Sequence, residues 1–369
     1  MSEDIAGEPL WFRYLDRRIV GSEWLHRPSS TLDHQLAGEI APAKRVVFCS
    51  LKGGVGRSTA LSVVAAEQAS QGRNILVVDL DLEAPGIGSL LLSTERTPAY
   101  GVVDYLVERN FWTSLETATP EDRRGREEVL RGMVGTCSLT SGAGLVDVVP
   151  ATGTRTLDQP RNYLAKLSRA MIEGLADPEQ PTPLATKLNN MLTELEALRR
   201  YDFVFIDVRA GLAELSASPL LALGAEVLLF GTAQAQTIQD LRFLFAHLST
   251  LTGDLRPSPW LRLKMVHAKA SNVEQRAQFR DDLWDLFTTF LYQGTADDNE
   301  DEFEVFNFAA DAPEAPHVPI VIPLDTAFAD WDPVRNPANM LSTYYARTFG
   351  DLITYVDDLL SVSELDGQD

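Results

Sequence analysis

The chain is poor in cysteine, in long apolar runs and in basic residues. Its two cysteines, Cys49 and Cys137, exclude a disulfide framework and allow one bridge at most. The apolar runs fall well short of the roughly 20 residues that a membrane-spanning helix needs. The start, MSEDIAGEPLWF, is acidic and lacks the basic and apolar layout of a signal peptide. These absences predict a cytoplasmic protein in a reducing compartment, with no membrane association.

Positive charge is also scarce, because 53 acidic residues stand against 32 basic ones and the formal net charge is −21. Such an excess of negative charge disfavours a broad electrostatic grip on nucleic acid. We therefore do not expect DNA as a partner.

What the sequence does contain is a regular alternation of apolar runs and helical patterns. An apolar content of 45% in 369 residues indicates a globular chain of one large or two ordinary domains. The short runs are typical of buried parallel strands. They predict an α/β fold, a doubly wound, mostly parallel sheet with helices on both faces. The expected strands are Lys44–Ser50, Asn74–Asp81, Gly144–Ala151, Tyr201–Val208, Ala225–Thr232, Leu261–Ala268 and Val318–Pro323, and expected helices cover 56–71, 184–200, 237–251 and 341–360.

Three segments do not follow this alternation. Residues 1–43 are expected to form an N-terminal extension, either a cap packed over the sheet edge or an arm that docks a partner. Residues 44–369 are expected to form one domain with insertions at about 111–143 and 295–316. The first insertion contains PEDRRGREEVLRG, which predicts a solvated helix, and the second contains the acidic stretch ADDNEDEFE, which predicts a flexible loop.

The stretch FCSLKGGVGRST, from Phe48 to Thr59, follows the first expected strand and opens a helix, as a phosphate-binding loop does. Its glycines allow a tight turn that presents backbone N–H groups to phosphate oxygens, and the helix N-terminus adds the positive end of its dipole. Ser58 is placed for Mg²⁺ and Thr59 for the α-phosphate. The expected nucleotide-binding residues are Gly53, Gly54, Val55, Gly56, Arg57, Ser58 and Thr59.

Two later strands end in acidic residues. Asp79 and Asp81 lie two apart in VVDLDLEAPG, so in a strand they would share a face and point toward the loop of the first strand. We expect Asp79 near the Mg²⁺ ion and Asp81 free to orient an attacking water. In FVFIDVRAG, Asp207 stands at the carboxyl end of the expected strand, where a Walker B acid holds Mg²⁺, and Gly211 is expected to place its N–H near the γ-phosphate.

The motifs KGGVGRST, DLDLEAPG and FIDVRAG, in this order, resemble those of the deviant Walker A ATPases of the MinD/ParA type, which belong to the SIMIBI class of P-loop NTPases. They look closest to a bacterial subgroup with KGGVGR in place of KGGVGK. The resemblance covers roughly residues 44–270 and implies ATP-dependent homodimerisation. It also implies that Lys52 crosses the dimer interface to the phosphates of the other subunit, that Asp81 orients the attacking water and that Asp207 is the Walker B acid.

The loop departs from the usual pattern in two places. Leu51 stands where many phosphate loops have glycine, and Arg57 replaces the lysine that spans the β- and γ-phosphates. Because arginine is bulkier, planar and bidentate, we expect Arg57 to clamp phosphate and hydrolysis to be slow. The stretch VHAKASN does not match the Asn-Lys-x-Asp signature of GTP-binding proteins, so ATP is the expected nucleotide, with His267 or Asn272 near the base.

The expected function is an ATP-hydrolysing, Mg²⁺-dependent dimeric switch that acts through an unidentified partner protein. The resemblance implies a bacterial multi-protein module, such as an antiviral defence system. An ATP sensor or scaffold with little turnover is the alternative that Arg57 motivates. An ATP-dependent ligase or a DNA-partitioning ATPase is less favoured, the first because no catalytic constellation is evident between Ala99 and Tyr201. The expected catalytic residues are Lys52, Asp81 and Arg57.

Overall fold

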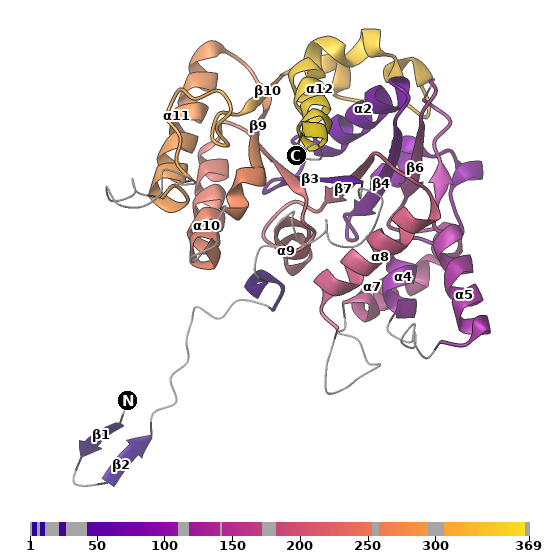
Figure 1. The fold of residues 1–369 in the computed structure, drawn as a ribbon, viewed down its shortest axis with the longest axis horizontal. Helices are drawn as coiled ribbons and strands as arrows, with labels where there is room; N and C mark the ends of the chain where they lie inside the picture. Colours follow the sequence, from indigo (N-terminus) through magenta and orange to yellow (C-terminus); the bar gives the residue numbers. More distant parts are fainter. Residues whose placement is uncertain are drawn as a thin grey trace.

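Figure 1 shows the fold in a computed structural model of the chain. The structure describes residues 2–5, 8–11, 22–26, 43–109, 118–140, 142–171, 182–252, 258–293 and 306–365. The acidic stretch at 296–304 therefore lies outside the described residues. Within the described ranges, no helix is both long and apolar enough to cross a bilayer.

A central sheet of eight strands organises the molecule. Its strands are β3 (Lys44–Ser50), β4 (Asn74–Leu80), β5 (Gly135–Thr136), β6 (Leu145–Val149), β7 (Phe203–Val208), β8 (Glu226–Gly231), β9 (Leu263–Ala270) and β10 (Ile320–Pro323). They lie in the order β10-β9-β8-β3-β7-β4-β6-β5, and every neighbouring pair is parallel except β5 with β6. The predicted doubly wound, mostly parallel α/β fold is confirmed.

Helices cover both faces of this sheet (Figure 1). Successive strand residues point to opposite faces, so Val46 and Phe48 pack in one core while Val47 and Cys49 pack in the other. The first core is covered by α2 (Arg57–Ser70), α3 (Ile87–Leu91) and α12 (Ser342–Leu365). The second is covered by α4 (Val102–Arg109), α5 (Pro120–Arg131), α7 (Tyr163–Ala170), α8 (Leu184–Leu198), α9 (Glu214–Leu221), α10 (Ala235–Thr252) and α11 (Val273–Phe290), and the short α6 (Thr154–Leu157) follows β6 in the chain.

Each of the seven expected strand segments overlaps an observed strand, and the differences are at the ends. The second strand stops at Leu80, so Asp81 is the first residue of the following loop. The sequence analysis missed β5 and an antiparallel hairpin of β1 (Ser2–Ile5) with β2 (Glu8–Trp11) inside the N-terminal extension. The solvated helix expected in the first insertion is α5, which Thr119 caps by accepting the Asp122 N–H.

The described residues of the extension that follow the hairpin form a 3₁₀ turn, η1 (Ser22–Leu25), that packs on the helical layer. The Glu23 carboxylate accepts the N–H groups of Leu184 and Ala185 at 3.0 and 3.2 Å, in the first turn of α8. An anion at this position satisfies helix N–H groups that have no partner within the helix. Trp24 is buried in the core on the same side. Glu23 thus caps α8, and Trp24 packs in the core between the sheet and the helices on this side.

Tight backbone packing in this layer predicts the effect of one glycine substitution. A Cβ atom at Gly153 would lie 2.4 Å from the backbone carbon and oxygen of Ala99. We expect Gly153→Ala to lower the free energy of unfolding by about 1–3 kcal/mol, because the backbone must move to admit the methyl group. Urea unfolding followed by circular dichroism measures the loss.

The matched control is Gly125→Ala in α5, where a Cβ atom would meet nothing within 4 Å. An exposed helical glycine replaced by alanine should raise the free energy of unfolding by about 0.5–1 kcal/mol. Equal effects of the two substitutions would contradict the packing argument.

Candidate functional site

The loop between β3 and α2 turns through glycines with left-handed backbone. Gly54 and Gly56 have φ angles of 75° and 92°, a region that favours glycine. A Cβ atom at Gly53, Gly54 or Gly56 would meet nothing within 4 Å, so the space beside the loop is open. Because α2 begins directly afterwards at Arg57, its first N–H groups have no partner within the helix. This is the geometry of an anion cradle.

A cavity of about 570 Å³ opens over the loop. All seven expected loop residues, from Gly53 to Thr59, line one part of it, together with Asp81 and Ala84. The remainder of the wall comes from Lys269 of β9, from the end of β10 and the segment that follows it (322–329), and from Thr348 and Phe349 of α12, with Ser50 and Ala210. Its volume lies within the roughly 300–1,000 Å³ of ordinary small-molecule sites.

Arg57 is buried, with 8% of its surface exposed, and its guanidinium reaches three side chains. Nε donates to Asp207 Oδ1 at 2.5 Å, Nη2 to Asp81 Oδ2 at 3.2 Å and Nη1 to Ser50 Oγ at 3.4 Å. Burial opposes its charge, but the two carboxylates outweigh burial and raise the pKa of Arg57. The Arg57 guanidinium, which was expected to clamp phosphate, instead points to the acidic residues at the ends of the neighbouring strands.

Asp207 and Asp79 lie side by side, since the register of β4 and β7 pairs them directly. Asp207 Oδ2 also accepts the Ser58 hydroxyl at 2.6 Å. Burial raises the pKa of Asp207 against the opposing influence of Arg57 and Ser58. Burial and the neighbouring Asp207 raise the pKa of Asp79 to about 8.

Asp81 sits where the loop leaves β4. Its Oδ1 accepts the Ala84 N–H at 3.2 Å while Oδ2 accepts from Arg57. Asp79 in turn accepts the N–H groups of Asp81 and Gly86, at 3.0 and 3.2 Å. The structure thus brings Asp81 to the cavity beside the phosphate loop and places Asp79 beneath the loop that carries Asp81.

Two expected residues have other partners. The Lys52 Nζ donates to Gln234 Oε1 at 2.5 Å on the surface of the molecule, and Lys52 does not line the cavity. The Gly211 N–H donates to the Ser50 carbonyl at 2.9 Å, and its φ of 103° accounts for the glycine at this position.

Sequence reasoning missed Lys269, which lies near the end of β9 and lines the cavity. Its φ is 54°, which is uncommon for a residue other than glycine. Its Nζ donates to the Gly54 carbonyl at 2.6 Å, so a second cation stands over the glycine loop. The signal available in the sequence was a lone charged residue near the end of the strand LKMVHAKA.

The segment after β10 was also missed as a wall of the site. Asp325 accepts the Ala327 N–H at 3.0 Å and the Thr348 hydroxyl at 2.8 Å, which ties this segment to α12. The Ala327 N–H and the Thr348 hydroxyl hold the pKa of Asp325 below its usual range. Pro323, Leu324 and the Phe328 ring give this end of the cavity an apolar surface suited to a flat ring.

His267 and Asn272, expected near the base, lie elsewhere. The His267 ring is buried against Phe279, with 4.4 Å between ring centroids, and neither of its nitrogens has a hydrogen-bond partner within the described ranges. Asn272 caps the N-terminus of α11 by accepting the Gln275 N–H at 2.8 Å. Neither residue lines the cavity.

The residues present fit a magnesium nucleotide. The open glycine turn and the free N-terminus of α2 suit phosphate. Ser58 Oγ and Asp207 Oδ2 are hard oxygen atoms close to each other, and Mg²⁺ is usually bound by one or two carboxylates together with phosphate and water. No cluster of three or more His, Cys, Asp or Glu side chains suited to a metal occurs in the described part of the chain. These donors therefore fit a Mg²⁺ site whose remaining ligands come from the nucleotide.

Comparison with known proteins finds likeness at the level of structure. No protein-family model and no curated protein matches the sequence. A ParA family ATPase from Chlorobium tepidum TLS is similar with a TM-score of 0.48 and 15% identity, over 84% of this chain and 98% of that chain. The cell division ATPase MinD from Pyrococcus furiosus gives a TM-score of 0.48 and 19% identity, over 86% and 99%. MinD from Pyrococcus horikoshii OT3, complexed with Mg-ADP, gives 0.44 and 17%, over 87% and 98%.

The ion pairs of Arg57 predict a large effect on stability. Replacing it by methionine in Arg57→Met leaves the buried Asp207 carboxylate without its counter-ion, so the free energy of unfolding should fall by about 3–5 kcal/mol. Arg57→Lys keeps the charge but cannot span both acids, and we expect a smaller loss. Urea unfolding without nucleotide measures both changes, and wild-type stability in Arg57→Met would contradict the assigned pairing.

The burial of His267 predicts a pH dependence. Burial and nearby Arg276 lower its pKa to about 4, below the unfolded value. The folded state therefore binds fewer protons, and wild-type stability should fall by about 2 kcal/mol from pH 7 to pH 5 through this residue. His267→Leu should remove that part of the slope, as measured by urea unfolding at the two pH values. Parallel pH curves for the two proteins would refute the prediction.

Proposed function

We propose that the chain is an ATP-binding and ATP-hydrolysing molecular switch that works as a homodimer through a partner protein. The observation that supports this most is the glycine loop under a 570 Å³ cavity, with Arg57 linking the acids at the ends of two neighbouring strands. Phosphoryl transfer to water requires a loop that binds the phosphates, hard oxygen ligands for Mg²⁺ and an acidic residue that can orient the attacking water.

In this proposal the phosphates lie over Gly53–Thr59, and Lys269 adds positive charge from above the loop. The base occupies the apolar end of the cavity beside Phe328. Adenine is favoured over guanine because the stretch VHAKASN lacks the Asn-Lys-x-Asp signature of GTP-binding proteins.

Ser58 and Asp207 would hold Mg²⁺, with Asp79 behind them, and the ion would supply charge stabilisation to the phosphate oxygens. Asp81 would accept a hydrogen bond from the attacking water, once Arg57 shares its donors with phosphate. The half-buried Lys52, now bonded to Gln234, would turn to the phosphates of the second copy, which would make the dimer the active form.

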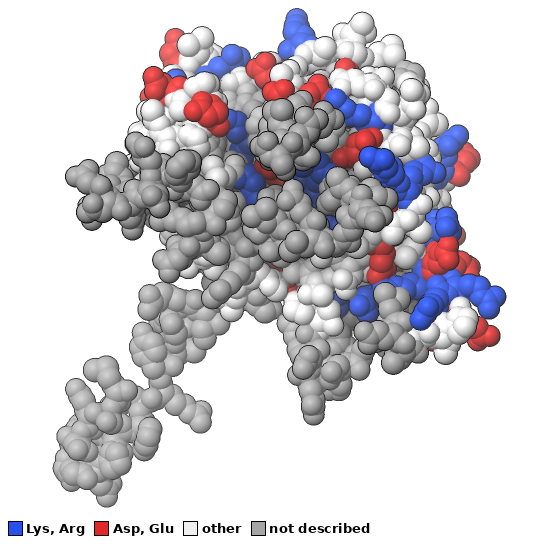
Figure 2. All heavy atoms as spheres, in the orientation of Figure 1, with Lys and Arg blue, Asp and Glu red and all other residues white. Residues whose placement is uncertain are grey.

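A nucleotide sensor with little turnover is the second candidate. The bonds of Arg57 to Asp207 and Asp81 favour it, because they engage the acids that hydrolysis needs. DNA partitioning is not favoured, since the net charge is −21 and basic side chains lie among acidic ones on the face shown in Figure 2.

The deciding experiment compares wild type, Asp81→Ala and Arg57→Lys with ATP and Mg²⁺. Binding of a fluorescent ATP analogue, dimerisation by light scattering and phosphate release are measured separately. We expect wild type to bind ATP and dimerise, and Asp81→Ala to bind but lose at least about tenfold in turnover.

Arg57→Lys separates the two candidates. A strong rise in its turnover over a near-silent wild type would favour the sensor, whereas measurable wild-type turnover lost in Asp81→Ala would favour the switch. A wild-type chain that does not bind the ATP analogue would refute both.

A further inference from the structure

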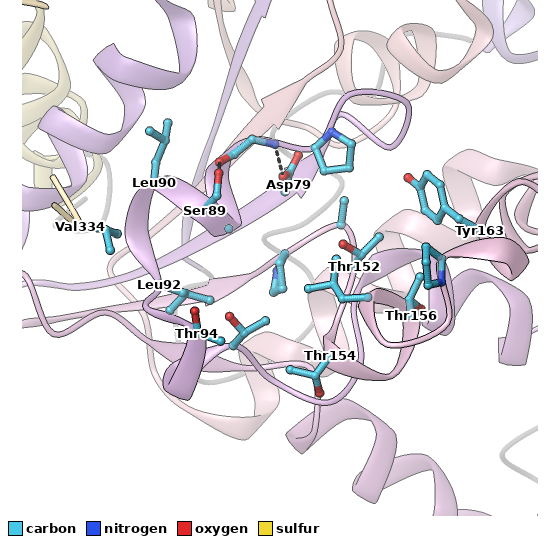
Figure 3. A pocket seen from close by; sticks show the side chains of 18 of the residues that line it. Asp79, Ser89, Leu90, Leu92, Thr94, Thr152, Thr154, Thr156, Tyr163 and Val334 are labelled. Atoms are coloured by element: carbon cyan, nitrogen blue, oxygen red, sulfur yellow. Dashed lines mark hydrogen bonds between the residues drawn. The ribbon is translucent and has the colours of Figure 1, made fainter. Parts of the chain in front are cut away.

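The loop at 81–86, which carries Asp81, lies between two cavities. Asp81 and Ala84 line the nucleotide cavity, while Pro85 and Gly86 line a second cavity of about 850 Å³. Figure 3 shows this second cavity, with Asp79 and Tyr163 among its labelled walls. Because Glu83, Ala84 and Pro85 in the middle of the loop are exposed, its position depends on a few anchors.

Two anchors hold the ends of the loop from below. Asp79 accepts the N–H groups of Asp81 and Gly86, and Figure 3 shows the second of these bonds. The Leu82 side chain is buried in the core and fixes the depth of the loop. These contacts leave the peptide groups between Leu82 and Gly86 without a bond to the sheet within the described residues.

Two more anchors come from other parts of the chain. The Tyr163 hydroxyl, from the first turn of α7, donates to the Leu82 carbonyl, directly after Asp81. On the surface, Arg209 from the end of β7 pairs with Glu83. Burial and the nearby Asp79, Asp81 and Glu83 raise the pKa of Tyr163 to about 12, so its hydroxyl keeps the proton it donates.

The helix that carries Tyr163 is itself fixed. Lys166, one turn further along α7, pairs with Asp104 at 2.6 Å and donates to Thr156 at 2.8 Å. Asp104 also accepts the Gly101 N–H at 3.0 Å. This network ties α7 to α4 and α6, so the Tyr163 hydroxyl approaches the loop from a rigid support.

We propose that Tyr163 is a positioning residue of the nucleotide site, whose bond to the Leu82 carbonyl holds the Asp81 loop in the orientation that turnover needs. This inference rests on the proposed ATPase function. Tyr163 does not line the nucleotide cavity, so it acts through the loop and not on the nucleotide.

The test is Tyr163→Phe in the full chain, which keeps the ring and removes the hydroxyl. The loss of one hydrogen bond that orients the loop should lower kcat about fivefold, with KM for ATP changed by less than about twofold. Hydrogen exchange without nucleotide should become faster at the amides of Ala84 and Gly86, while exchange elsewhere and the Tm stay near wild type. The control is Tyr201→Phe, which removes a hydroxyl that donates to Asp147 away from the site and should change neither kcat nor exchange at 81–86.

The two readouts keep this inference separate from the proposed function. Unchanged exchange at 81–86 in Tyr163→Phe overturns the positioning role, whatever happens to turnover. Faster exchange with unchanged kcat in an active wild type also overturns it. If wild type shows no ATP turnover, the ATPase proposal fails while the exchange measurement still decides whether Tyr163 holds the loop.

Discussion

One guanidinium compensates the carboxylates buried at the carboxyl edge of the sheet, and the rest of the site is arranged around it. Asp207 is 1% exposed and Asp79 is fully buried, so neither can rely on water for solvation. A buried carboxylate without a partner costs several kcal/mol, and Arg57 pairs with only two of the three carboxylates here, Asp207 and Asp81. The raised pKa values of Asp79 and Asp207 reflect their burial in this crowded cluster. A divalent cation next to Ser58 and Asp207 would supply positive charge that the cluster lacks.

The order of the strands is what creates this crowding. β7 lies between β3 and β4, so the ends of three parallel strands meet beside the first turn of α2. The register places Asp207 opposite both Phe48 and Asp79, at the same height in the sheet. Arg57, the first residue of α2, therefore arrives within reach of Asp207 and of the residue that follows β4.

Much of the fold could be predicted because parallel strands buried on both faces must be apolar along their whole length, and seven such runs are visible. Asp79, Asp81 and Asp207 could be predicted because an acid at the carboxyl end of a buried parallel strand lies at the edge where α/β sheets bind ligands. Lys269 and the segment at 323–329 were not found, since the strand order β10-β9-β8-β3, and no local sequence pattern, brings them beside the glycine loop. The two residues of β5 carry no periodicity to detect. The direction of the Arg57 guanidinium depends on whether it binds the acidic residues or phosphate, and no local sequence pattern indicates which.

Because acids and phosphate compete for the same guanidinium, Arg57 affects the site in a way that a lysine would not. A lysine ammonium is a compact charge that can serve one acid closely, whereas the guanidinium of Arg57 serves Asp207 through Nε and Asp81 through Nη2 at once. Phosphate can gain these donors only if the acids give them up. Mg²⁺ held by Ser58 and Asp207 would make that exchange easier, because it replaces the charge that Asp207 loses. In the proposed function, nucleotide and cation binding are therefore coupled through Arg57, and release of Asp81 from the guanidinium is the step that prepares it to orient water.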